Sequence, residues 1–139
     1  MILKSVKLRN IRSYLNEKVE FPTGSVVLSG DIGSGKSSIL HAVEFALFGI
    51  LNTDIGGESL LRHGKNEGGV ELKFQVKNKE YVIKRKLKRR KDSVGQASGY
   101  IIKNGKKKEG TAIELKSQIL NILGYPNELL HKRKNLIFR

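Results

Sequence analysis

The residues best suited to chemistry in this chain form a glycine-rich loop that ends in lysine and serine. Residues 30–37, Gly-Asp-Ile-Gly-Ser-Gly-Lys-Ser, match the pattern G-x-x-x-x-G-K-[ST] at every fixed position. Glycines let successive backbone N–H groups turn toward phosphate oxygens, where a side chain would block their approach. In such a loop the lysine reaches the β- and γ-phosphates and the serine hydroxyl ligates Mg²⁺.

We therefore predict a P-loop that binds ATP with Mg²⁺, in which Lys36 is the catalytic residue and Ser37 the metal ligand. The loop residues predicted to contact the nucleotide are Gly30, Gly33, Ser34, Gly35, Lys36, Ser37 and Ser38.

The flanking segments are those that a P-loop requires. Residues 25–29 form a short apolar run typical of a buried parallel strand, and residues 39–48 form an apolar helical segment that Gly49 closes. An ordinary glycine turn is the alternative, but such a turn does not need a strand before it and a helix after it. Nucleotide binding is therefore the favoured interpretation.

Length and composition indicate one globular domain or part of one. The chain has 139 residues, of which 38% are apolar, and no cysteine, so a disulfide framework is excluded. No apolar stretch is long enough to span a membrane, and cations interrupt the N-terminus where a signal peptide would need an apolar core. We expect a soluble, cytoplasmic, nucleoid-associated protein without a membrane partner.

The positive charge is concentrated in the middle of the chain. The net charge is +14, and residues 64–110 hold fifteen Lys or Arg residues against five Asp or Glu residues. A polyanion is the natural partner of such a segment, although a solvated basic surface without a partner is the alternative. We predict contacts to the DNA backbone, without base readout, from Lys84, Arg85, Lys86, Lys88, Arg89, Arg90, Lys91, Lys106, Lys107 and Lys108.

Hydrophobic patterning predicts an α/β fold. Residues 1–9 and 17–21 read as strands of a hairpin, and residues 70–76, 81–83 and 99–103 read as an antiparallel meander within residues 64–110, with the basic run 84–91 at its tip. A capping box of Thr111 and Glu114 begins a further helix, which Gly124 ends.

Four segments together resemble one family of ATPases. They are residues 10–14 (Asn-Ile-Arg-Ser-Tyr), 19–21 (Val-Glu-Phe), 33–40 (Gly-Ser-Gly-Lys-Ser-Ser-Ile-Leu) and 42–49 (Ala-Val-Glu-Phe-Ala-Leu-Phe-Gly). With them, nearly the whole chain resembles the N-terminal half of the ATPase head of the SMC family. Within it, the archaeal double-strand-break repair ATPases (Rad-fifty) and their bacterial SbcC-type relatives are the most similar.

The resemblance implies that residues 1–139 form the N-terminal lobe (lobe I) of an ABC-type P-loop NTPase head, without its coiled coil and C-terminal lobe. In that lobe a mixed sheet surrounds the P-loop helix and an antiparallel β-meander is added. It further implies that Arg12 and Ser13 lie near phosphate and that Arg62 and His63 lie near the adenine or ribose. The implied partners are the C-terminal half, a second head in an ATP-bridged homodimer, DNA and a nuclease subunit.

The chain departs from the family pattern at several points. His41 stands where the family commonly has an acid, and Asp31-Ile32 replaces a segment that commonly ends in asparagine. The sequence contains no Q-loop glutamine, no Walker B acid pair and no signature motif. Phosphoryl transfer needs an acid to order the metal and a residue to orient water, so we expect this chain alone to bind ATP but to hydrolyse it poorly or not at all.

Two other functions remain open from the sequence. A small self-contained P-loop kinase acting on a nucleotide or metabolite would share the loop, but it would also need an arginine-bearing lid. A nucleic-acid-binding module with a vestigial P-loop would bind DNA regardless of ATP.

Overall fold

A computed structural model describes residues 1–21, 36–50, 57–91 and 93–124, although not the side chains of residues 36, 37, 57 and 58. The strands are β1 (Ile2–Ile11), β2 (Tyr14–Glu20), β3 (Glu67–Val76), β4 (Lys79–Arg89), β5 (Val94–Lys103) and β6 (Lys106–Gly110). The helices are α1 (Lys36–Phe48), α2 (Gly57–Leu60) and α3 (Ala112–Leu123).

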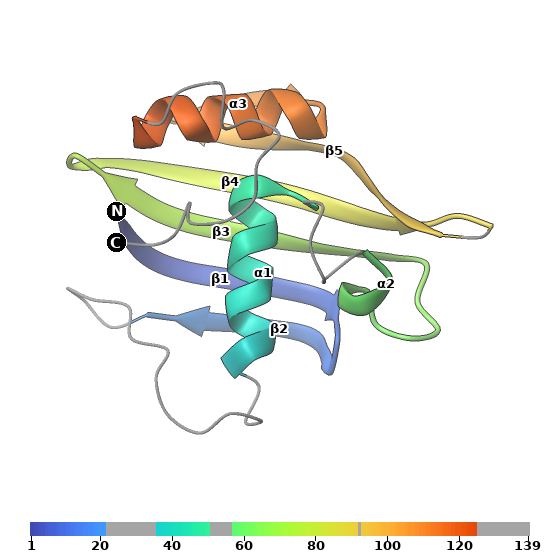
Figure 1. The fold of residues 1–139 in the computed structure, drawn as a ribbon. Helices are drawn as coiled ribbons and strands as arrows, with labels where there is room; N and C mark the ends of the chain where they lie inside the picture. Colours follow the sequence, from blue (N-terminus) through green and yellow to red (C-terminus); the bar gives the residue numbers. More distant parts are fainter. Residues whose placement is uncertain (22–35, 51–56, 92, 125–139) are drawn as a thin grey trace.

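All six described strands belong to one sheet, in the order β2-β1-β3-β4-β5-β6 (Figure 1). Every neighbouring pair is antiparallel, and β1 pairs with both β2 and β3. The predicted N-terminal hairpin and the predicted meander are thus parts of one continuous sheet. The parallel-type strand predicted for residues 25–29 lies outside the described residues.

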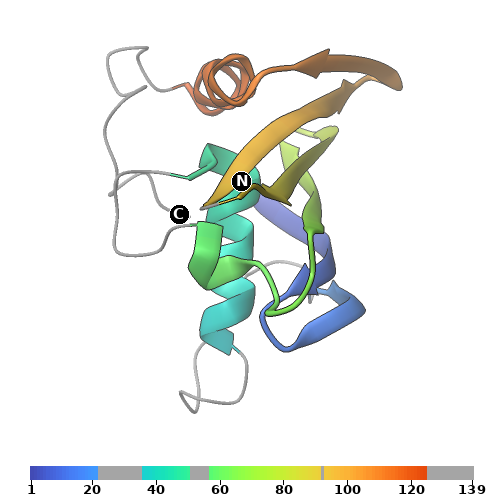
Figure 2. The same ribbon diagram turned by 90° about the vertical axis from the view of Figure 1, so that its right-hand side faces the viewer.

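The helices lie on one side of this sheet (Figures 1 and 2). Helix α1 crosses β1, β3 and β4, and α3 runs alongside β5. We call the side under the helices the covered face and the opposite side the open face. No described element lies over the open face, so the side chains on that face meet solvent or a partner.

Alternation along the strands divides apolar from charged residues between the two faces. On β1, Val6 and Leu8 are buried on the covered face, whereas Lys7 and Arg9 are exposed on the open face. This is the pattern of an antiparallel sheet with one solvated side. The core side chains that the covered face and the helices bury include Leu3, Val6, Leu8, Val43, Phe45, Leu47, Leu72, Phe74, Ile83, Leu87, Ile101, Leu115 and Ile119.

Helix α3 confirms the capping prediction at both ends. The Thr111 hydroxyl accepts the Glu114 backbone N–H, and the Glu114 carboxylate accepts the Thr111 backbone N–H. These bonds hold the pKa of Glu114 below its usual range. Gly124 adopts the left-handed conformation, with φ of 83°, that ends the helix.

The predicted position of the basic run was wrong. Residues 84–91 do not form the tip of the meander, because β4 continues to Arg89. Ile83, Arg85 and Leu87 alternate onto the covered face and are buried, which keeps this segment in the sheet. In the part of the chain that the structure describes, no helix is long and apolar enough to cross a membrane.

Candidate nucleotide-binding site

Helix α1 begins at Lys36, so the lysine and serine of the P-loop pattern stand at its N-terminus. Gly30, Gly33, Ser34 and Gly35 lie outside the described residues, as do the side chains of Lys36 and Ser37. The first turn of α1 carries no acidic residue, so no carboxylate of that turn opposes an anion at the unpaired N–H groups and the positive end of the helix dipole.

Arg12 reaches this first turn from the β1–β2 hairpin. Its backbone has a positive φ of 50°, and its N–H donates to the Leu60 carbonyl at 2.8 Å. The Arg12 guanidinium donates through Nη1 to Ser38 Oγ at 3.3 Å and through Nε to the Ser59 carbonyl at 3.1 Å. A cation is therefore held between the start of α1 and the end of α2.

Arg62 fixes the hairpin that carries Arg12. The Arg62 N–H donates to the Asn10 carbonyl at 2.9 Å, and its Nη1 donates to the Arg12 carbonyl at 3.0 Å. Ser13 and His63 are exposed next to this cluster. The structure thus brings Arg12, Arg62 and Ser38 together, with Ser13 and His63 at the rim, and their contact with a nucleotide stays a prediction.

His41 lies one turn after Ser38 on α1 and is half-buried. Its Nδ1 is buried and has no hydrogen-bond partner among the described residues. Burial, together with the positive charge of Arg12, lowers the pKa of His41, so the imidazole is neutral at pH 7. This chain therefore places a neutral base one turn into α1.

The opposite end of α1 is closed by Arg85, whose side chain is 1% exposed. Its guanidinium donates to the Ala46 carbonyl at 2.8 Å, to the Leu47 carbonyl at 2.9 Å and to the Ala112 carbonyl at 3.2 Å. Burial lowers the pKa of Arg85 to about 9, which leaves it charged at neutral pH. The prediction that Arg85 contacts DNA was therefore wrong, because the guanidinium is buried and occupied by helix carbonyls.

The other predicted DNA contacts fall into separate groups. Lys84, Lys86 and Lys88 project from the open face of β4, as the register with β3 shows. Arg89 donates through Nε to the Lys65 carbonyl at 2.9 Å, and Lys107 lies over the Tyr100 ring at 4.2 Å. The remaining cations, Arg90, Lys91, Lys106 and Lys108, are exposed.

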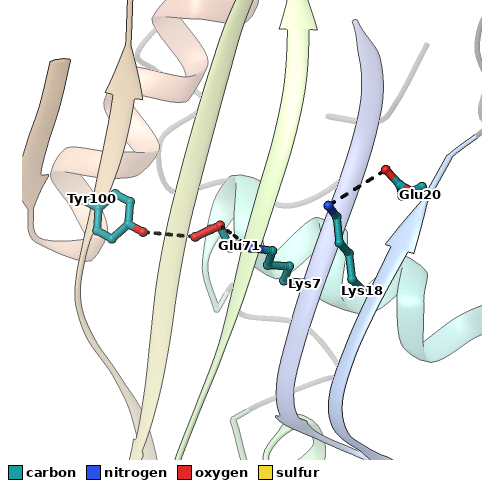
Figure 3. A network of polar contacts seen from close by, with 5 residues as sticks. All are labelled: Lys7, Lys18, Glu20, Glu71 and Tyr100. Atoms are coloured by element: carbon teal, nitrogen blue, oxygen red, sulfur yellow. Dashed lines mark hydrogen bonds and ion pairs between the residues drawn. The ribbon is translucent and has the colours of Figure 1, made fainter. Parts of the chain in front are cut away.

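The open face also holds charged residues that the sequence analysis did not select. Lys7 and Arg9 lie on β1, and Lys18 lies on β2. Glu71 on β3 accepts the Tyr100 hydroxyl at 3.1 Å (Figure 3). The alternation in residues 1–9 was the available signal, since it separates Lys7 and Arg9 from Val6 and Leu8. Among the described residues no group of three or more His, Asp or Glu side chains could hold a metal ion.

Comparison with known proteins identifies the class of protein to which the chain belongs. A family model described as an AAA domain matches residues 5–139, so the chain belongs to this family of P-loop ATPases. A RecF–ATP structure from the RecFOR pathway shares the fold, with a TM-score of 0.56 and 23% identity over 79% of this chain and 28% of that chain. The SMC head domain from Thermotoga maritima gives a TM-score of 0.51 and 25% identity over 85% of this chain and 42% of that chain. The fold is therefore the N-terminal lobe of a RecF- or SMC-like ATPase head.

Within this class the chain is similar to the N-terminal region of DNA double-strand break repair Rad50 ATPases. It is 37% identical to the Methanocaldococcus jannaschii protein over 124 residues, which is 89% of this chain and 12% of that protein. It is 35% identical to the Sulfolobus acidocaldarius protein over 138 residues, which is 94% of this chain and 15% of that protein. The chain thus spans less than a sixth of the length of these curated relatives.

Proposed function

We propose that this chain is the nucleotide-binding lobe of a DNA double-strand-break repair ATPase and that it binds ATP with Mg²⁺ at the N-terminus of α1. The observation that carries the proposal is the hydrogen bond from Arg12 Nη1 to Ser38 Oγ at 3.3 Å. It holds a cation from another element at the helix end where the P-loop pattern directs the phosphates.

Each group at this helix end has a distinct role in the proposal. Lys36 neutralises the β- and γ-phosphate oxygens, and the Ser37 hydroxyl ligates Mg²⁺. Mg²⁺ keeps several waters and takes few protein ligands when it is bound with a nucleotide, which fits a site with one serine hydroxyl. Arg12 adds positive charge with Ser13 beside it near the phosphates, and the half-buried Arg62 and the exposed His63 lie toward the adenine or ribose.

Hydrolysis needs groups that this chain does not contain. The sequence has no Walker B acid pair and no signature motif. The proposed ATPase therefore hydrolyses ATP only when the C-terminal half of the same protein and a second head complete the site. DNA is a further proposed partner, supported by the name of the similar DNA double-strand break repair Rad50 ATPases. A nuclease subunit is proposed as well, because the resemblance to the SMC family implies one.

The test compares this chain alone with a mixture. Isothermal titration measures Mg·ATP binding, and phosphate release measures turnover, first for the chain and then after adding a C-terminal segment of its full-length protein. Binding by the chain alone with turnover only in the mixture is the expected result. Steady phosphate transfer by the chain alone, to water or to an acceptor, would contradict the proposal and select a self-contained P-loop enzyme.

A further inference from the structure

One half of the open face is electrostatically balanced. Lys7 lies 3.9 Å from Glu71, Lys18 lies 4.0 Å from Glu20, and Lys73 lies 3.7 Å from Glu80, each measured from Nζ to a carboxylate oxygen. Figure 3 shows the first two of these pairs. We call Lys7, Lys18 and Lys73 the paired cations. Each has its charge offset by a neighbouring carboxylate.

The other half of the open face is basic. Arg9 on β1 and Lys84, Lys86 and Lys88 on β4 project there, and we call these four residues the unpaired cations. In the described part of the chain no carboxylate forms an ion pair with any of them within 4.0 Å. Glu67 is the partner of Lys88 in the strand register, yet it makes no such pair. These four residues therefore form a group of cations without an ion-pair partner among the described residues.

Gly69 brings three of the unpaired cations around one spot on the sheet. The register pairs Gly69 with Arg9 on one side and with Lys86 on the other, and Gly69 itself places no side chain between the two cations. A Cβ placed on Gly69 would lie 3.4 Å from Lys84 Cε and 3.9 Å from Lys84 Nζ, so Lys84 leans across the glycine. Gly69 itself is buried, so the three cations, and not the backbone of β3, form the surface that an anion meets at this spot.

The surroundings favour phosphate over an acidic protein segment. Strand β4 is paired on both sides, with β3 and β5, so it offers no free edge for strand addition. Protein interfaces rely on apolar or aromatic anchors, and the exposed large apolar residues in the described part of the chain are Leu15 and Ile113, on β2 and α3. Cations without such anchors are typical of contacts to a nucleic-acid backbone.

We propose that the unpaired cations, Arg9, Lys84, Lys86 and Lys88, form a binding surface for the phosphate backbone of duplex DNA. The inference rests on the proposed function, which makes DNA the polyanion. It assigns the DNA contact to one half of the open face rather than to the whole basic run of residues 84–91. It includes Arg9, excludes the buried Arg85, and does not need the lysines of β6.

Two triple variants with equal loss of charge test this surface. The first, Arg9→Gln/Lys86→Gln/Lys88→Gln, removes three unpaired cations, and the second, Lys7→Gln/Lys18→Gln/Lys73→Gln, removes the paired cations. All six side chains are exposed, so both variants are expected to fold, which urea unfolding checks. Anisotropy of a labelled duplex of about 20 base pairs, measured without nucleotide between about 50 and 200 mM salt, reports affinity.

The first variant is expected to bind at least about tenfold more weakly, and the slope of log affinity against log salt falls by about 3 because three phosphate contacts are lost. The second variant is expected to lose less than about threefold in affinity for the duplex, since the cations that it removes are paired with carboxylates. Equal losses in the two variants would overturn the proposal, because binding would then follow total charge. Unchanged affinity in the first variant would overturn it too.

A competitor separates DNA from an acidic protein. A polyglutamate peptide of the same charge as the duplex is expected to compete weakly, and competition equal to that of unlabelled duplex would overturn the assignment to DNA. The assay contains no nucleotide, so its result is independent of ATP binding at α1. Failure of ATP binding would contradict the proposed function and leave the DNA result unchanged.

Discussion

The two ends of helix α1 differ in which side chains contact their terminal backbone groups. At the C-terminal end the fold supplies donors for three carbonyls: Arg85 donates to those of Ala46 and Leu47, and Gly49 turns left-handed and donates to that of Phe45 at 2.8 Å. At the N-terminal end the fold supplies Arg12, which is half-buried, next to the P-loop pattern and the unpaired Nδ1 of His41.

This difference gives the two ends of one helix separate roles, because contacts at the C-terminal end stabilise the fold and groups at the N-terminal end are available to a nucleotide. A buried arginine bonded to three carbonyls rigidly joins β4, α1 and the start of α3. The N-terminal end keeps its N–H groups and a nearby cation for a ligand. Substitutions at the C-terminal end should therefore affect folding, and those at the N-terminal end should affect nucleotide binding.

The largest effect is expected for Arg85→Met. The variant leaves the Ala46, Leu47 and Ala112 carbonyls without their donor in a buried site, which costs about 3 kcal/mol or more in the free energy of unfolding. Urea unfolding followed by circular dichroism measures the loss. Arg85→Lys keeps the charge but not the three bonds, so it should recover only part of the stability.

Lys86→Met is the matched control on the same strand. Its side chain is exposed on the open face, so the free energy of unfolding should change by no more than about 0.5 kcal/mol. If Arg85→Met were as stable as Lys86→Met, the C-terminal end of α1 would not depend on Arg85.

A smaller effect, on affinity rather than stability, is expected for Arg12→Ala. The variant removes a cation from the phosphate end of α1, and Mg·ATP affinity should fall by about tenfold, the weight of one charge-assisted contact. Its hydrogen bonds are part-buried or exposed, so unfolding changes little. Arg9→Ala, which removes a cation from the open face, should leave Mg·ATP affinity unchanged in the same titration, and equal losses would contradict a specific role for Arg12.

The smallest effect is a pH dependence from His41. Its pKa is lowered in the folded chain, so the unfolded chain binds the proton first as the pH falls through the ordinary value of 6.5. The free energy of unfolding therefore has its full value above pH 6.5 and decreases as the pH falls below it. Unfolding at about pH 7.5 and about pH 5.5 should show a smaller pH effect for His41→Gln than for the unaltered chain. An identical pH effect in both would contradict this role of His41.

The sequence predicted the elements whose signals are local. The helix after the P-loop and the capped helix α3 were found from short patterns, and the structure has both. The burial of Arg85 was missed, although Leu87 is the single apolar residue of the run 84–91 and shares its face with Arg85. The contact from Arg12 to the Ser59 carbonyl joins residues 47 positions apart, and no local pattern reports such a contact.

The central claim is that the N-terminal end of α1 binds Mg·ATP through the P-loop. Titration of Mg·ATP into the unaltered chain and into Lys36→Ala tests it most directly, with urea unfolding to show that both are folded. The claim predicts saturable binding that weakens by about a hundredfold in the variant, as expected when a lysine that bonds two phosphates is removed. Equal affinity in the two folded proteins would contradict it.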